Sequence, residues 1–168
     1  MPFLLVLLLL LCGVPLWAAD SVPVKITADK MQYSQKADEV VFSGNVYVLR
    51  QDMELWSDTL TVLLEKQQTE AKKASAIDQQ GSIKKIIAKG NVRMTAANNR
   101  SGTCGLATYD ARTETLVLEN NPILREGQNT IQGEVIKLYI KENRSEVLGG
   151  KKRVEAIFIT PDRKPGLP

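Results

Sequence analysis

The stretch that decides the fold is Val40-Val41-Phe42-Ser43-Gly44-Asn45-Val46-Tyr47-Val48, in which two apolar runs flank a Gly-Asn pair. Val40, Phe42, Val46 and Val48 share one phase of a period-two pattern, so a bent β-strand would place all four on one face. Glycine adopts a left-handed or bulged backbone at little cost, and asparagine tolerates it next best. The stretch therefore predicts two strand segments joined by a bend that leaves one face apolar.

This unit recurs along the chain. Ile86-Ile87-Ala88-Lys89-Gly90-Asn91-Val92-Arg93-Met94 carries the same pattern around a second Gly-Asn-Val signature. Residues 28–65 also align without a gap onto residues 104–141, where Asn120-Asn121-Pro122 is a degenerate form of that signature. Internal repeats of this kind indicate stacked units that bury a shared core. Because short period-two apolar stretches run from residue 20 to residue 160, we expect an all-β chain.

A bend at equivalent places in stacked strands would fold a long sheet over on itself and enclose its apolar face. The expected object is a folded-over sheet, a sandwich or a jelly roll. The side chains predicted to face its interior are Val24, Ile26, Val40, Phe42, Val46, Val48, Leu60, Val62, Val92, Met94, Leu116, Leu118, Ile136 and Leu138.

The two ends of the chain lie outside this pattern. Residues 3–11 form an almost unbroken Leu/Val run, followed by Pro15 and the small pair Ala18-Ala19. The run is as long as a signal-peptide core and shorter than the roughly 20 residues that span a bilayer. We expect a signal peptide over residues 1–19, with an uncleaved anchor as the alternative because no Lys or Arg precedes the run. Residues 20–160 are the predicted domain, and the proline-rich residues 161–168 a flexible tail.

Composition excludes several kinds of site. The 168 residues contain no histidine, which removes Ser-His-Asp and Cys-His nucleophiles and HExxH zinc sites. Asp29, Asp58 and Glu134 occupy repeat-equivalent places, which indicates a turn or strand-start role instead of a paired catalytic site. A net charge of +3 is too small to indicate a nucleic-acid partner. We therefore expect no enzyme, no metal, no cofactor and no nucleic-acid partner, and Cys104 is expected to be buried as a small apolar residue.

Three segments together resemble a known family. Ile26-Thr27-Ala28-Asp29-Lys30-Met31, the Val40 to Val46 stretch and Trp56-Ser57-Asp58-Thr59-Leu60 are similar to the OstA-like repeat of the LptA family of periplasmic lipopolysaccharide-transport proteins. The resemblance extends to about Ile159. It implies an OstA-like open, folded-over β-jellyroll of antiparallel strands with an apolar interior that takes the acyl chains of lipopolysaccharide.

The resemblance also implies partners and a place in the cell. Members of the family stack end to end in the periplasm and bridge an inner-membrane exporter to an outer-membrane assembly complex. The implied partners are lipopolysaccharide, an exporter subunit, an outer-membrane assembly protein of the same fold, and further copies of the chain joined head to tail.

The residues supply a mechanism for that role without chemistry. Exposing an acyl chain to water costs ~0.8 kcal/mol per CH₂, so a continuous apolar trough would shield the lipid by itself. The fourteen interior residues are then candidate lipid-binding residues, with a closed, dry core as the alternative. Residues 24–28 and 154–159 are candidate docking strands, with ordinary solvent-covered edges as the alternative. Two other functions stay open: a membrane-anchored, LptC-like receiver of lipopolysaccharide, and a structural β-module without a ligand.

Overall fold

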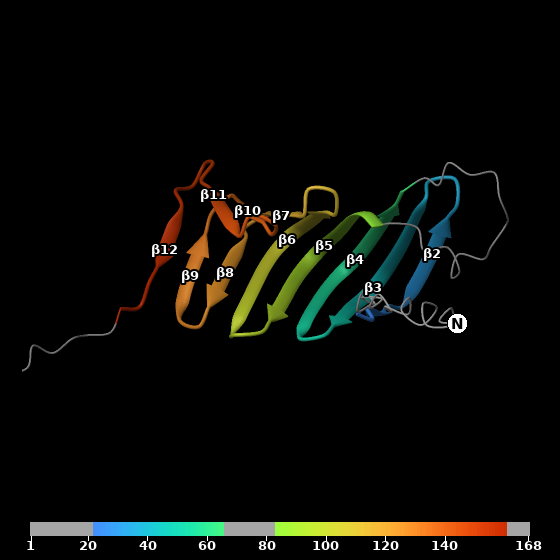
Figure 1. The fold of residues 1–168 in the computed structure, drawn as a ribbon, viewed down its shortest axis with the longest axis horizontal. Helices are drawn as coiled ribbons and strands as arrows, with labels where there is room; N and C mark the ends of the chain where they lie inside the picture. Colours follow the sequence, from blue (N-terminus) through green and yellow to red (C-terminus); the bar gives the residue numbers. More distant parts are fainter. Residues whose placement is uncertain (1–21, 66–82, 161–168) are drawn as a thin grey trace, which may run out of the picture.

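The computed structural model describes residues 22–65 and 83–160, which form one antiparallel sheet of twelve strands in the described part of the chain (Figure 1). The expected signal peptide and the expected tail lie outside the described residues, as does most of the stretch 65–85, which is rich in Lys, Gln, Ala and Glu. The strands are β1 (Lys25–Thr27), β2 (Lys30–Ser34), β3 (Glu39–Arg50), β4 (Met53–Leu64), β5 (Ile83–Ala96), β6 (Arg100–Asp110), β7 (Thr115–Glu119), β8 (Ile123–Glu126), β9 (Asn129–Gln132), β10 (Val135–Tyr139), β11 (Arg144–Leu148) and β12 (Glu155–Ile157).

The sheet is folded along a line that crosses its middle. Strands β3 to β6 are 11 to 14 residues long and contribute one half to each side of this line. One side, here the upper wall, is completed by β2, β7, β10 and β11, and the other, the lower wall, by β1, β8, β9 and β12. The line between the walls is here called the corner, and each place along it where the chain passes from one wall to the other is counted as one corner. The all-β, folded-over architecture predicted from the repeat is confirmed.

The predicted bends lie at the corner. Gly44 and Gly90 have φ of +80° and +81°, and the asparagine after each is also left-handed, with φ of 46° and 47°. The pairing register of β3 with β4 shifts between Ser43 and Val46, so the extra residues form a bulge that turns the strand. Asn120, in the degenerate copy, has φ of 62°, which confirms that it stands in for glycine there.

The repeat found in the sequence is a repeat of strands. Each strand pairing in the first copy recurs 76 residues later: Val40 lies opposite Val62, and Leu116 lies opposite Leu138. The continuous β3 corresponds to β7 and β8 together, and β4 corresponds to β9 and β10 together. The second copy has therefore kept its register while losing strand continuity at the corner.

The core lies between the two walls. Ten buried apolar residues form one cluster, and Val46, Val92, Leu118 and Ile136 are at most 1% exposed. Cys104 belongs to this cluster, as predicted, and burial raises the pKa of its thiol. The last residues of the stretch 65–85 belong to the sheet, because Ile83 and Lys85 of β5 pair with neighbouring strands. No helix long and apolar enough to cross a membrane occurs among residues 22–65 and 83–160.

Candidate functional site

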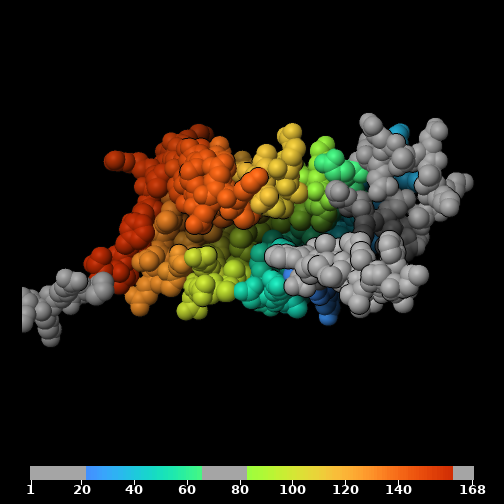
Figure 2. Space-filling view, in the orientation of Figure 1, coloured from blue at the N-terminus to red at the C-terminus, as the bar shows by residue number. Residues whose placement is uncertain are grey.

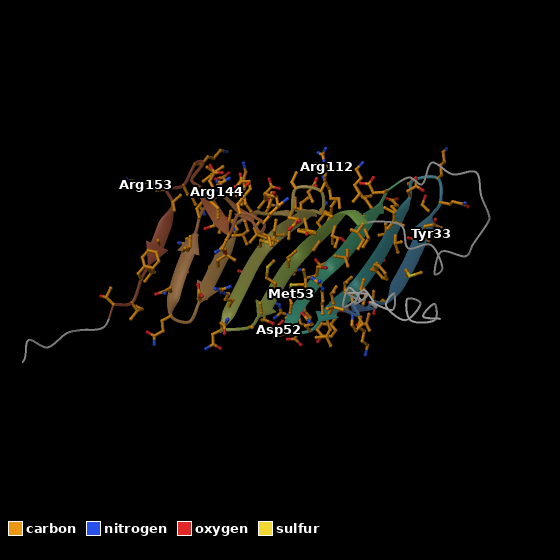
Figure 3. The ribbon with its side chains drawn as sticks, viewed as in Figure 1. Tyr33, Asp52, Met53, Arg112, Arg144 and Arg153 are labelled. Carbon is orange, nitrogen blue, oxygen red and sulfur yellow. The ribbon has the colours of Figure 1, made fainter. Side chains whose placement is uncertain are left out.

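The inner face of the folded sheet is the candidate site. Hairpin turns connect strands at the edge of each wall that lies farthest from the corner. These two edges are here called the rims. Figure 3 shows Arg112 and Arg144 along the upper rim and Asp52 and Met53 along the lower one. In the space-filling view the surface is hollowed between the two rims, along the middle of the molecule (Figure 2). This hollow with the inner face beneath it is here called the trough.

Most residues predicted to face the interior lie there. Val46, Val48, Leu60, Val62, Val92, Leu118 and Ile136 belong to the buried cluster, and Ile26, Val40, Phe42, Met94, Leu116 and Leu138 are partly buried and pack against it. Val24 is the exception, with a side chain that is 52% exposed. The prediction for Val24 is wrong because the residue precedes β1 and has no strand neighbour to cover it.

Several inner residues were missing from that prediction. Ala88 and Ala107 are buried in the cluster, and Leu55, Ile86, Leu124 and Val147 pack against it. Ile86 and Ala88 follow the same period-two phase as Val92 and Met94, so the pattern contained the signal for them. Leu124 comes from the second copy, where breaks at the corner interrupt the phase, and Val147 lies in β11, beyond the end of that copy. The inner face is therefore longer than the sequence indicated and runs from Ile26 in β1 to Val147 in β11.

Side-chain hydrogen bonds hold two of the corners. The amide of Asn45 donates to the Asp29 carboxylate over 2.8 Å, and that of Asn91 donates to Asp58 over 2.9 Å. A Cβ on Gly44 or Gly90 would overlap the same carboxylate. Each Gly-Asn pair thus supplies both the space for an aspartate and the donor that binds it. The turn role predicted for Asp29 and Asp58 takes this form, which is here called the Asp–Asn clasp.

The outer face of the lower wall carries an aromatic cluster. The rings of Tyr47 and Trp56 lie 5.4 Å apart, and the Arg93 guanidinium lies 5.7 Å from the Trp56 ring. Tyr47 donates a hydrogen bond to Glu54 over 2.6 Å, and this bond, with burial, raises the pKa of the phenol. Because adjacent strands contribute these side chains, the cluster ties the wall together across its outer surface.

One turn of the upper rim is ordered by a carboxylate. Asp110 accepts hydrogen bonds from the backbone N–H groups of Arg112 and Thr113 over 3.0 and 3.2 Å, and Lys85 lies 3.9 Å away. The backbone donors, led by that of Thr113, and the nearby cations lower the pKa of Asp110. The turn between β6 and β7 is therefore held in one conformation by an ionised side chain at neutral pH.

The arrangement suits apolar binding more than chemistry. Within residues 22–65 and 83–160 there is no group of three or more Cys, Asp or Glu side chains that could hold a metal ion. The inner face supplies aliphatic side chains together with Phe42, Met94 and, opposite Phe42, Met31, and these can contact methylene groups without directional bonds. Its chemical capacity is to shield an apolar chain from water.

Both ends of the folded sheet carry free strand edges. At one end β1 and β2 each pair only with β3, and at the other β11 pairs only with β10 and β12 only with β9. Exposed apolar side chains gather at these ends: Met31 is 60% exposed, Ile157 49% and Phe158 64%. The predicted docking strand over residues 154–159 is shorter in the structure, because only Glu155–Ile157 are paired.

Comparison with known proteins identifies the family. The model of the family described as LptA/(LptD N-terminal domain) LPS transport protein matches residues 25–144. Among solved structures, the chain is similar to LptH, described as the LptA-homologous periplasmic component of the lipopolysaccharide transport device of Pseudomonas aeruginosa, at 16% identity and a TM-score of 0.65. The match covers 83% of this chain and 96% of LptH, and it shows a shared fold. No curated protein matches the chain. The chain belongs to the LptA and LptD N-terminal domain family of lipopolysaccharide transport proteins.

Proposed function

We propose that this protein carries lipopolysaccharide through the periplasm with the acyl chains of the lipid held between its two walls. The observation that carries the proposal is the inner face, which is apolar from Ile26 in β1 to Val147 in β11 apart from the buried Ser57 opposite Val46. Each methylene group that such a face removes from water contributes about 0.8 kcal/mol to the free energy of binding. Family membership and the periplasmic location of LptH support the same role.

The acyl chains are expected to supply the binding energy. Purified full-length protein should bind purified lipopolysaccharide and should bind the same lipopolysaccharide after complete de-acylation at least about 100-fold more weakly, since loss of even four contacting methylenes costs about 3 kcal/mol. Titration with each preparation, followed by intrinsic tryptophan fluorescence or calorimetry, measures the difference. Equal binding of both preparations would contradict a lipid-carrying trough and would favour a structural module with a dry core.

We further propose that copies of this chain associate end to end and continue the trough. Neighbouring strands alternate in direction along each wall, from β2 to β11 in the upper wall and from β1 to β12 in the lower one. The first and last of the eight strands in a wall therefore run in opposite directions. A second copy in the same orientation would pair antiparallel at both free edges and satisfy their unpaired backbone groups. The same edges could take an exporter subunit or an outer-membrane protein of the same fold.

End-to-end association is expected to depend on the exposed apolar side chains of β12. Replacing Ile157 with Asp places a charge on the free edge and should shift the protein from concentration-dependent oligomers to monomers in sedimentation velocity. Met53→Asp is the matched control, because Met53 is a comparably exposed apolar residue, at 39%, on the lower rim away from both ends. A wild-type protein that stays monomeric at all concentrations, or an equal effect of the two substitutions, would rule out this edge as the contact.

A further inference from the structure

We propose that β8, β9 and β12 form a mobile panel of the lower wall, which swings relative to the upper wall and widens the trough near its C-terminal end. The panel consists of residues 123–132 and 155–157 (Figure 1). Its mobility is inferred from structural features alone, whereas its purpose, to admit or release the lipid, rests on the proposed function. Four features distinguish the panel from the rest of the lower wall.

Strand continuity is the first feature. The strands β3, β4, β5 and β6 pass through the corner as single strands, although at the N-terminal end two residues separate β1 from β2. Beyond Glu119 each passage is broken: three residues separate β7 from β8, two separate β9 from β10, and six separate β11 from β12. A continuous strand transmits the orientation of one wall to the other, but a loop does not. The three panel strands are therefore free of this constraint.

The corner contacts are the second feature. In the alignment of the two copies, which are 76 residues apart, Gly105 takes the place of Asp29 and Asn120 takes the place of Gly44. This corner, here the third, consequently has no carboxylate. It keeps only the backbone hydrogen bond, in which the Gly105 N–H donates to the Asn120 carbonyl over 2.9 Å as the Asp29 N–H donates to the Gly44 carbonyl in the first copy. Within the described residues, no side-chain hydrogen bond crosses this corner. The Asp–Asn clasp that holds the first two corners is therefore missing where β8 begins. Between β9 and β10, the carboxylate of Glu134, the repeat equivalent of Asp58, accepts a backbone N–H, that of Lys151, over 3.3 Å.

Packing is the third feature. Of the three panel strands, only β8 contributes to the core cluster, through the partly buried Leu124. Ile131 pairs with Leu124 and Ala156 pairs with Ile131, so both share its face of the sheet, yet neither belongs to the cluster. The upper wall opposite contributes the fully buried Leu118 and Ile136. Moving the panel therefore uncovers little buried apolar surface, which makes the motion inexpensive.

A cavity at the corner is the fourth feature. It has a volume of about 650 Å³ and is lined by residues 121–123, 132–133 and 152–155. These are the segments that connect the panel to the upper wall, together with the adjoining end residue of each panel strand. Space there allows these connections to change conformation without overlap. On its other side the panel is attached to β6 by four paired residues and by the exposed Arg100–Glu126 ion pair, so this ladder serves as the hinge.

The repeat provides a matched test of the motion. Spin labels at Arg112→Cys and Gln128→Cys report the opening between the upper rim and the panel. Labels at Lys36→Cys and Asp52→Cys occupy the equivalent places 76 residues earlier, across corners that are clasped. All four residues are exposed, and the full-length chain would carry Cys12→Ala and Cys104→Ala. We expect a broad distance distribution for the Arg112–Gln128 pair and a narrow one for the Lys36–Asp52 pair, measured by pulsed electron spin resonance without lipid.

A second variant rebuilds the clasp at the third corner. Gly105→Asp restores the carboxylate, Asn120→Gly removes the side chain that a Cβ at position 105 would meet at 2.7 Å, and Asn121 already stands where Asn45 stands. This double substitution should narrow the Arg112–Gln128 distribution and leave the Lys36–Asp52 distribution unchanged. Circular dichroism verifies that the variant folds. If it does not fold, the comparison of the two label pairs in the protein without these substitutions decides whether the panel moves.

The outcomes separate the panel from the proposed function. Equally narrow distributions for the two label pairs, with and without lipopolysaccharide, would overturn the panel even if the lipid binds. A broad Arg112–Gln128 distribution that shifts to longer distances with purified lipopolysaccharide would support both the motion and its purpose. If that distribution is broad but purified lipopolysaccharide neither binds nor shifts it, the panel stands and the proposed function fails.

Discussion

Replacing Gly90 with alanine is expected to lower the free energy of unfolding by about 3 kcal/mol. Two costs combine at this position. A left-handed backbone, here with φ of +81°, costs a residue with a Cβ about 1–2 kcal/mol. The new Cβ would also overlap the Asp58 carboxylate, so the Asp–Asn clasp with Asn91 would have to break or shift.

A second glycine isolates the contribution of the clasp. Gly127 also has a positive φ, of 58°, but a Cβ there would meet nothing within 4 Å. Gly127→Ala should therefore cost only about 1 kcal/mol, for the backbone conformation alone. Chemical denaturation of both variants measures the two values. Equal losses of stability would mean that the bend needs glycine only for its backbone and that the aspartate at the corner is dispensable.

A single carboxylate inside the trough is expected to weaken lipopolysaccharide binding by at least about tenfold. Phe42 lies on the inner face of β3, where it is partly buried against the core cluster. In Phe42→Glu the charge would keep water in the trough and displace the acyl chain from this position. Loss of contact with two methylenes already costs about 1.6 kcal/mol, which corresponds to slightly more than tenfold in affinity.

The adjacent residue provides the control for charge. Val41 lies on the same strand with its side chain on the opposite face, between Gln32 and Thr61 of the neighbouring strands. Val41→Glu adds the same charge at the outer surface and should leave lipid affinity within about twofold of the wild type. Both variants are compared at temperatures well below their thermal midpoints, so that loss of fold is not read as loss of binding. Equal weakening by the two substitutions would contradict an inner binding face.

Much of the fold could be predicted because its information is local. The phase of Val40, Phe42, Val46 and Val48 determines one face of a strand, and the Gly-Asn pair between them determines the bend. Both signals survive in a single copy, and the repeat shows that they recur at equivalent places. The family comparison and the strand pairing confirmed the resulting architecture.

Other features depend on partners that are distant in the sequence. The contact between Asp58 and Asn91 joins residues 33 positions apart, and nothing near either residue indicates that they meet. Val24 follows the apolar phase, yet it is exposed because no strand lies beside it. The irregular corner of the second copy is signalled in the sequence by the degenerate Asn120-Asn121-Pro122, but the breaks between β9 and β10 and between β11 and β12 have no such signal. The continuity of the trough can therefore be predicted from neighbouring residues, whereas the stiffness of its corners depends on contacts between residues far apart in the sequence.

The measurement that tests the central claim most directly is site-specific photo-crosslinking in cells that produce native lipopolysaccharide. A photoreactive residue is placed at Phe42, Val48 or Leu138 on the inner face, and at Val41 or Arg93 on the outer face. A trough that carries lipid predicts lipopolysaccharide adducts from the three inner positions and none from the two outer ones. Adducts from outer positions alone, or from no position in a folded and correctly exported protein, would contradict the account.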